Sequence, residues 1–170
     1  MGDEYLKELR TKFWKALRLQ FHMSRSFLQP GDHTKSGWVQ FKVGNMKESK
    51  NVGLNLRIHW LNNCLSYQML VVYLGHPKPP DTKHDPAFSR LWLDFMCKRQ
   101  NEIHNALGYE LERDNHCRIE KYLKAKPVVA DIRNLDAWQG YITDMRIQAE
   151  HLHTAFQPHA LAFNEAHLNG

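Results

Sequence analysis

The chain has only three cysteines in 170 residues, and none of them stands in a CxxC pair. Cys64, Cys97 and Cys117 are odd in number and widely spaced. We therefore expect neither a disulfide framework nor a zinc site, and we expect the protein to be cytoplasmic, in a reducing compartment.

Long apolar runs are also missing. The longest run, Met69 to Leu74, falls far short of the roughly 20 residues that a membrane-spanning helix needs. The first ten residues are charged from Asp3 onward and lack the apolar centre of a signal peptide. The sequence thus predicts no membrane contact.

Motifs of several enzyme classes are absent as well. The nine glycines are scattered, so there is no phosphate-binding loop, and there is no GxSxG nucleophile motif. The 11 histidines lack the spacing of a zinc motif, and a loop site at His76 and His84 is the less favoured alternative. We expect no metal, no cofactor and no catalytic residues.

Positive charge is concentrated in the first third of the chain. Residues 1–60 hold 11 Lys and Arg and 5 Asp and Glu, a net of 11 − 5 = +6. Residues 61–170 hold 12 and 13, a net of −1. With no linker between the two parts, we expect a single domain over residues 1–170 that has a polarised surface.

Apolar residues recur with helical spacing in three segments and alternate, or run together, in five shorter ones. The order α-βββ-α-ββ-α predicts an α+β fold, in which three main helices cover one face of a mostly antiparallel five-stranded sheet. The predicted helices span Asp3 to about Phe21, Asp85 to Leu107 and Trp138 to Phe156, and the predicted strands span residues 38–43, 54–60, 65–74, 109–113 and 117–123.

Turn residues punctuate these elements. Asn62-Asn63 favours a tight hairpin because asparagine tolerates positive φ, and Asp114-Asn115 predicts a second hairpin turn. Gly108 is expected to stop the middle helix. Pro158 is expected to follow the end of the last helix, which leaves a frayed tail from about residue 158.

The chain carries Phe13-Trp14 in its first predicted helix, NEIHNALGYEL from Asn101 to Leu111, and Arg118-Ile119 in its second hairpin. Together with the segment Trp138 to Phe156, these motifs resemble a bacterial domain family of unknown function. Its members often follow a predicted restriction-type nuclease domain, or stand alone as short proteins. The resemblance implies a setting in bacterial or phage DNA defence.

The chain departs from this family at two places where acids are usual. His104 stands where the family tends to have glutamate, and the segment Ser66 to Tyr73 contains no acid. The spacing of a PD-(D/E)xK nuclease occurs at Glu48–Lys50 and Asp81–Lys83, against roughly 1.4 chance matches for this composition. Because the predicted central strands hold no carboxylate for Mg²⁺, a degenerate nuclease is the least favoured function.

Basic residues interleave with aromatic residues in the first third, a pattern typical of surfaces that hold a nucleic-acid backbone and stacked bases. The sequence therefore predicts a non-catalytic nucleic-acid-binding or accessory domain. The alternative is a protein-interaction module, such as a phage inhibitor that docks on a host defence nuclease. The candidate contact residues, for nucleic acid or for a protein partner, are Lys7, Lys12, Lys15, Arg18, Lys42, Lys47, Lys50 and Arg57.

Overall fold

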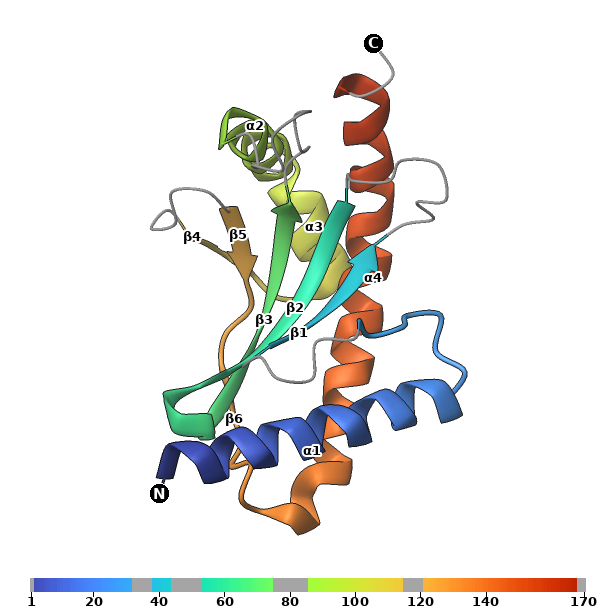
Figure 1. The fold of residues 1–170 in the computed structure, drawn as a ribbon. Coiled ribbons are helices and arrows are strands. Elements are labelled where there is room, and N and C mark those ends of the chain that lie inside the picture. Colours follow the sequence, from blue (N-terminus) through green and yellow to red (C-terminus); the bar gives the residue numbers. More distant parts are fainter. Residues whose placement is uncertain (1, 32–37, 44–52, 75–85, 115–120, 168–170) are drawn as a thin grey trace, which may run out of the picture.

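The protein folds as helices packed on an antiparallel sheet, in a computed structural model that describes residues 2–31, 38–43, 53–74, 86–114 and 121–167 (Figure 1). The predicted α+β class is confirmed. The helices are α1 (Gly2–Met23), α2 (Pro86–Cys97), α3 (Gln100–Leu107) and α4 (Trp138–His167), with short 3-10 turns η1 (Asn62–Cys64) and η2 (Leu135–Ala137). The strands are β1 (Trp38–Val43), β2 (Gly53–Leu61), β3 (Ser66–Leu74), β4 (Glu112–Asp114), β5 (Lys121–Lys124) and β6 (Val128–Val129).

The strands are ordered β1-β2-β3-β5-β4, and β6 also pairs with β3. Strand β5 pairs with one end of β3 and β6 with the other, so the two follow each other along one edge of β3. Between them, the Gln68 side-chain amide donates to the Ala125 carbonyl at 2.8 Å. The sixth strand was not expected, because two residues are too few to show an alternating pattern.

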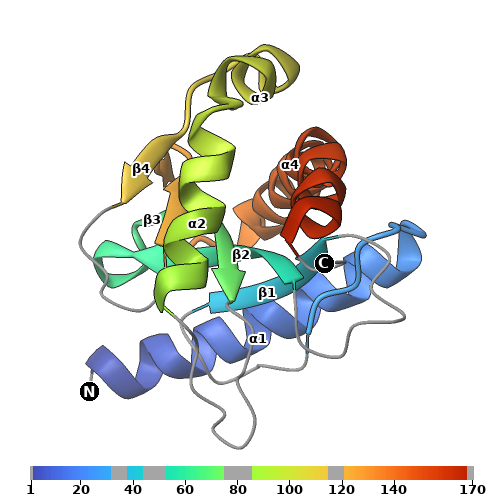
Figure 2. The same ribbon diagram turned by 90° about the horizontal axis from the view of Figure 1, so that it is seen from above.

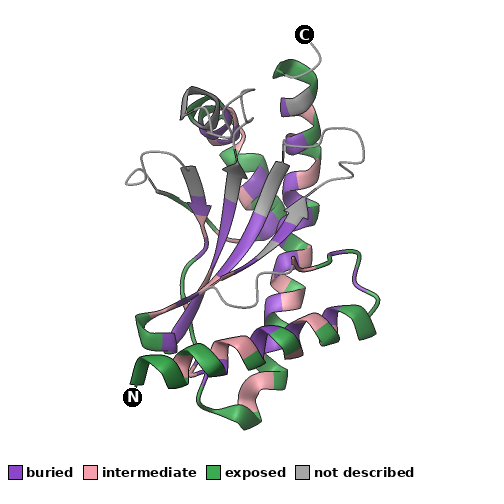
Figure 3. Cartoon of the chain, viewed as in Figure 1, coloured by how far each residue is buried: buried purple, intermediate pink, exposed green. Residues whose placement is uncertain are grey.

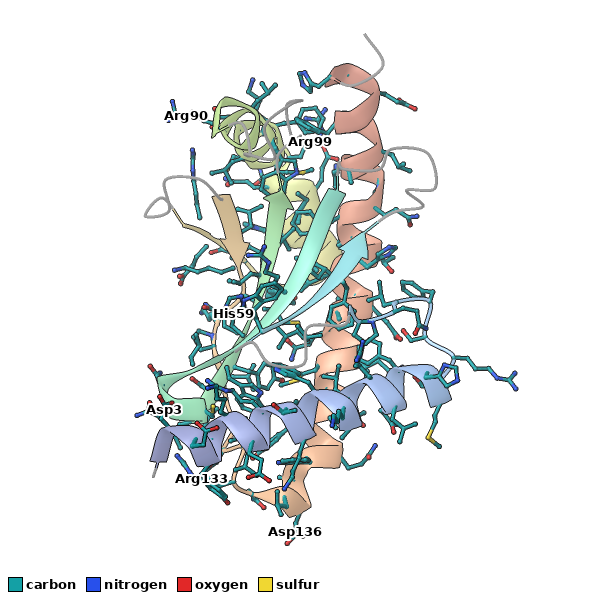
Figure 4. The ribbon with its side chains drawn as sticks, viewed as in Figure 1. Asp3, His59, Arg90, Arg99, Arg133 and Asp136 are labelled. Carbon is teal, nitrogen blue, oxygen red and sulfur yellow. The ribbon has the colours of Figure 1, made fainter. Side chains whose placement is uncertain are left out.

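The register divides the side chains of the sheet between two faces. Val39 lies opposite Ile58, and Phe41 lies opposite Leu56; all four are buried on the face that packs against the helices. Trp38 lies opposite His59, and both belong to the other face of the sheet; His59 is labelled in Figure 4. The alternation read from the sequence therefore assigns the core face correctly.

Helix α1 runs across the long helix α4, which is seen nearly end-on in Figure 2. The crossing is filled by aromatic rings: Phe13 lies 5.0 Å from Trp60 and 5.3 Å from Trp138, both edge-on. Further along α1, Phe21 lies 5.0 Å from Phe41. One side of α1 is buried from Leu9 to Phe21, and the opposite side faces solvent, as Figure 3 shows.

Two predicted turns have the expected backbone. Asn62 and Asn63 have φ of 47° and 53°, and Cys64 continues the left-handed turn with a φ of 65°. Gly108 ends α3 with a φ of 76°, and its N–H donates to the His104 carbonyl. Glycine and asparagine adopt positive φ at little cost, so both turns could be predicted from these residue types.

The single middle helix predicted for residues 85–107 is wrong, because the helix breaks into α2 and α3 at Lys98 and Arg99. Arg99 leaves helical geometry, with φ −109° and ψ 10°. Its guanidinium folds back over the Phe95 ring at 3.6 Å and donates to the Phe95 carbonyl at 3.3 Å. The Arg99 side chain therefore lies along the last turn of α2, while its backbone is in the turn before α3.

The predicted end of the last helix before Pro158 is also wrong. Helix α4 continues to His167, so residues 158–167 are helical and are not a frayed tail. Proline removes one helical hydrogen bond, but the residues beyond it are held by packing. Phe163 is fully buried, and its ring lies 5.2 Å from that of Phe95 on α2.

The second hairpin is confirmed in part, as β4 and β5 pair with each other. Strand β4 is shorter than the predicted segment 109–113 and begins three residues later. Cys117 and Arg118-Ile119 lie outside the described residues, as does Asn115 of the predicted turn.

Candidate binding surface at the end of helix α1

The predicted contact residues divide into three groups. Lys7, Lys12, Lys15 and Arg18 lie on α1, whereas Arg57 lies on β2. The remaining three predicted positions, Lys47 and Lys50 and the side chain of Lys42, lie outside the described part of the chain. The structure thus brings together only the four residues that one helix already joins.

Arg57 does not belong to an exposed basic surface. Its side chain is buried, with 7% of its surface exposed, and its guanidinium lies 4.6 Å from the centre of the Trp38 ring. Trp38 also stacks on His59, with ring centres 6.1 Å apart. Arg57 therefore stabilises the outer face of the sheet through a cation–π contact, and its guanidinium is shielded from solvent.

Two of the three cations in the first half of α1, Lys7 and Lys12, are paired with acids of the preceding turn. Lys7 lies 3.9 Å from Glu4, and Lys12 lies 2.7 Å from Glu8. The hydrogen bond and the charge of Lys12 lower the pKa of Glu8, and Glu8 raises the pKa of Lys12 in the same way. Asp3 adds a further acid at this end, and Figure 4 labels Arg133, which pairs with Asp131, in the region below it. The first half of α1 is therefore close to neutral.

The second half of α1 and the turn after it contain no acid at all. Between Glu8 and Asp32 the sequence has five Lys and Arg residues and no Asp or Glu. Lys15, His22 and Arg25 are exposed, and within the described residues they make no ion pair and no side-chain hydrogen bond. Uncompensated positive charge is concentrated at this end.

Large apolar side chains lie among these cations. Leu19 and Met23, one helical turn apart, are 59% and 68% exposed, and Phe27 in the following turn is 61% exposed. We call the set Lys15, Leu19, His22, Met23, Arg25 and Phe27 the α1-end surface. Phe27 is one of the aromatic residues that interleave with basic residues in the sequence. Leu19 and Met23 were not expected to be exposed together, because α1 was assigned one apolar stripe and its other side was expected to be solvated.

The turn after α1 is fixed to α4. The Ser26 hydroxyl donates to Glu150 at 2.7 Å and accepts from the Leu28 N–H at 3.2 Å. Arg146 holds both oxygens of Glu150, each at 3.3 Å. Leu28 is buried in the core, so this short segment has a defined position.

Phe27 is held from the side by a buried histidine of α4. Its ring lies 4.9 Å from that of His153, in an edge-on arrangement, while most of the phenyl surface stays exposed. Burial lowers the pKa of His153, so the neutral imidazole is the favoured partner of the phenyl ring. A ring that is fixed on one side and exposed on the other is presented to a partner with little loss of side-chain entropy on binding.

A small cavity of about 160 Å³ is a weaker candidate for a binding site than the α1-end surface. It lies between α2, α3 and the β4–β5 hairpin. Its one fixed cation, Arg113, is paired with Asp94 at 3.2 Å, and His104 accepts a hydrogen bond from the Leu111 N–H. Its polar groups are thus largely engaged within the fold. Its lining residues are Met96, Cys97, Gln100, Ile103, His104, Leu111, Arg113 and Leu123.

Two further features, a metal site and a membrane-spanning helix, concern the described residues. No group of three or more His, Cys, Asp or Glu there is placed to hold a metal ion. No helix in the described ranges is long and apolar enough to cross a membrane. The triplets Glu48–Lys50 and Asp81–Lys83 lie outside those ranges.

Comparison with known proteins finds no match to a family model, to a curated protein or to a solved structure. The resemblance to a nuclease-associated family therefore stays a prediction. The function must be argued from the surface that the fold presents.

Proposed function

We propose that this chain is a non-catalytic interaction domain that docks on an acidic surface of another protein through the α1-end surface. One observation carries the proposal. Two cations that have no acidic partner within the described residues, Lys15 and Arg25, lie there with the exposed His22 and with three apolar side chains that are each more than half exposed.

The apolar residues favour a protein over a nucleic acid. A phosphate backbone offers anions but little that Leu19 or Met23 could pack against. Aromatic residues, methionine and arginine are the types enriched in the cores of protein interfaces. A partner with carboxylates around an apolar patch would complement both the charges and the apolar side chains of this surface.

Nucleic-acid binding is the second candidate. It is favoured by the acid-free segment between Glu8 and Asp32, with its five Lys and Arg residues. Lys15 and Arg25 could each contact a phosphate, and Phe27 could stack on a base. The family resemblance fits either candidate: it suggests a DNA-defence setting, in which the partner would be a nuclease or its DNA.

Parallel binding measurements separate the two candidates. A random peptide library is selected on the purified protein, and short single- and double-stranded DNA are titrated by fluorescence anisotropy over a salt series. We expect enriched peptides that combine Asp or Glu with large apolar residues, and weak DNA binding. Tight DNA binding that falls steeply with salt would favour the second candidate instead. If neither peptides nor DNA bind, the proposed function is wrong.

The matched control uses the two halves of α1. Lys15→Glu with Arg25→Glu reverses the uncompensated charges, and Lys7→Glu with Lys12→Glu reverses the compensated ones. We expect the first double variant to lose the enriched peptides and the second to retain them. Equal loss in both would mean that overall charge, rather than the α1-end surface, governs binding.

A further inference from the structure

Arg25 has a backbone conformation that is unusual for its residue type. Its φ is 54°, in the left-handed region. The Ser26 N–H donates to the Phe21 carbonyl and the Arg25 N–H donates to the His22 carbonyl, both at 3.2 Å. These two bonds form a Schellman motif, in which Arg25 occupies the position that most often holds glycine.

The same chain uses glycine at the comparable position of another helix. Gly108 follows α3 with a φ of 76°. For arginine the left-handed conformation brings the Cβ atom too close to the next carbonyl, a cost that glycine avoids. Local backbone stability would thus favour glycine at both helix ends.

No polar or ring contact of the Arg25 side chain within the described residues offsets this cost. The side chain is exposed, and within the described residues it has no hydrogen bond, ion pair or ring contact. Its neighbours Met23 and Phe27 are exposed apolar residues, and Ser26 and Leu28 fix the turn to α4 and to the core. The fold therefore presents an exposed arginine on a backbone of defined position, two residues from an exposed apolar residue on either side in the sequence.

We propose that Arg25 is a partner-binding residue whose guanidinium receives a carboxylate of the protein partner, beside an apolar side chain that packs on Met23 and Phe27. The planar guanidinium matches a carboxylate with two parallel hydrogen bonds, which a lysine cannot reproduce. Backbone strain that persists without a structural benefit is typical of functional positions. This inference rests on the proposed function and names the chemistry of its central contact.

The test measures stability and binding on the same variants. Arg25→Gly removes both the strain and the guanidinium, and we expect the melting temperature to rise by about 2–4 °C. Arg25→Ala removes the side chain but keeps the left-handed cost, so its melting temperature should stay near the wild-type value. Affinity for the peptides selected on the wild-type protein should fall by about tenfold or more in both variants. Arg25→Lys should lie between these and the wild type, and Lys12→Ala should bind as the wild type does.

Each outcome has a distinct meaning. A melting temperature that does not rise in Arg25→Gly would show that the side chain contributes to the fold, and would overturn the inference. Unchanged peptide affinity in Arg25→Gly and Arg25→Ala would overturn it too, while leaving the proposed function intact. Absence of any selected peptide would defeat the proposed function itself. Binding of DNA that depends on Arg25 would identify the anion as a phosphate and overturn the carboxylate contact.

Discussion

The two halves of α1 share one buried stripe but differ on their exposed side. In the first half, Glu4 and Glu8 pair with Lys7 and Lys12. In the second half and the turn after it, no acid is present, and large apolar side chains are exposed among the cations. The exposed side of α1 thus has paired charges, as is usual for a solvated surface, in its first half. In its second half it has the mixture of cations and apolar side chains that is typical of an interface.

The helix dipole explains part of this difference and leaves another part unexplained. Acids near the start of a helix and bases near its end are both stabilising, so the order of charge along α1 needs no partner. The dipole gives no reason for Leu19, Met23 and Phe27 to be exposed together, nor for arginine at a left-handed position. The apolar residues and Arg25 therefore distinguish the second half more sharply than its charge does.

The largest expected effect separates the buried side of α1 from the exposed side. Phe13 is fully buried and contacts the rings of Trp60 and Trp138, so Phe13→Ala should lower the free energy of unfolding by about 3–5 kcal/mol. Phe27→Ala, at the exposed end, should cost about 1 kcal/mol or less, mainly through the lost contact with His153. Urea denaturation of both variants measures the difference. A cost above 3 kcal/mol for Phe27→Ala would show that Phe27 belongs to the core.

The next effect concerns the attachment of the turn to α4. Glu150→Ala removes the acceptor of the Ser26 hydroxyl and the partner of Arg146. We expect a loss of about 1–3 kcal/mol in unfolding free energy, because both groups are partly or fully buried and would be left without this partner. Amide hydrogen exchange at Phe27 and Leu28 should also become faster. Glu165→Ala, an exposed glutamate of the same helix, is the control and should change stability by less than about 0.5 kcal/mol.

The sequence was sufficient to predict the elements that follow one strong pattern. The stripe Leu9, Phe13, Leu17, Phe21 predicted α1, and the alternation through Leu56, Ile58 and Trp60 predicted β2 and its buried face. The elements that were predicted wrongly do not follow one strong pattern. Helix α4 continues past Pro158, where Phe163 packs on Phe95 of α2, and this long-range contact leaves no local signal in the sequence. The middle helix breaks at Arg99, whose side chain folds back onto Phe95 four residues earlier.

The candidate site was predictable in its charge but not in its composition. Counting charges identified Lys15 and Arg18, but it also selected Arg57, whose burial over Trp38 depends on strand register. One local feature distinguishes Lys12, which is paired, from Lys15, which is not: Lys12 has a glutamate four residues before it. The conformation of Arg25 depends on where α1 ends, which sequence patterns locate only to within a few residues.

A smaller effect links pH to the turn through His153. Burial lowers its pKa, so below the ordinary value of about 6.5 the unfolded chain takes up a proton more readily than the folded chain does. The contribution of neutral His153 to stability should therefore be fully present above this pH. It should decrease as the pH falls from there toward the lowered pKa of His153 in the folded state.

The measurement is the melting temperature from pH 7.5 to pH 5 for the wild type, His153→Gln and the exposed His22→Gln. We expect His153→Gln to reduce the loss at low pH. Some loss should remain, because burial lowers the pKa of His159 as well. His22→Gln should follow the wild type. If His153→Gln and the wild type lose stability in parallel, His153 does not carry the effect.

The smallest expected effect on stability comes from converting the second half of α1 into a copy of the first. Leu19→Glu places an acid one turn after Lys15 and removes one exposed apolar side chain. The change should alter unfolding free energy by less than about 0.5 kcal/mol, because the site is exposed. A slight loss is expected, because an acid late in a helix opposes the dipole and the Lys-to-Glu order is the weaker one.

Binding should respond to Leu19→Glu far more than stability does. The variant neutralises Lys15 and lowers the apolar content of the surface together, so affinity for the peptides selected on the wild-type protein should fall strongly. Leu19→Gln removes only the apolar side chain, so its affinity for these peptides should lie between that of the wild type and that of Leu19→Glu. If Leu19→Glu binds as tightly as the wild type, the difference between the two halves of α1 reflects the helix dipole alone. If Leu19→Gln binds as weakly as Leu19→Glu, the apolar contact contributes more to binding than the charge of Lys15 does.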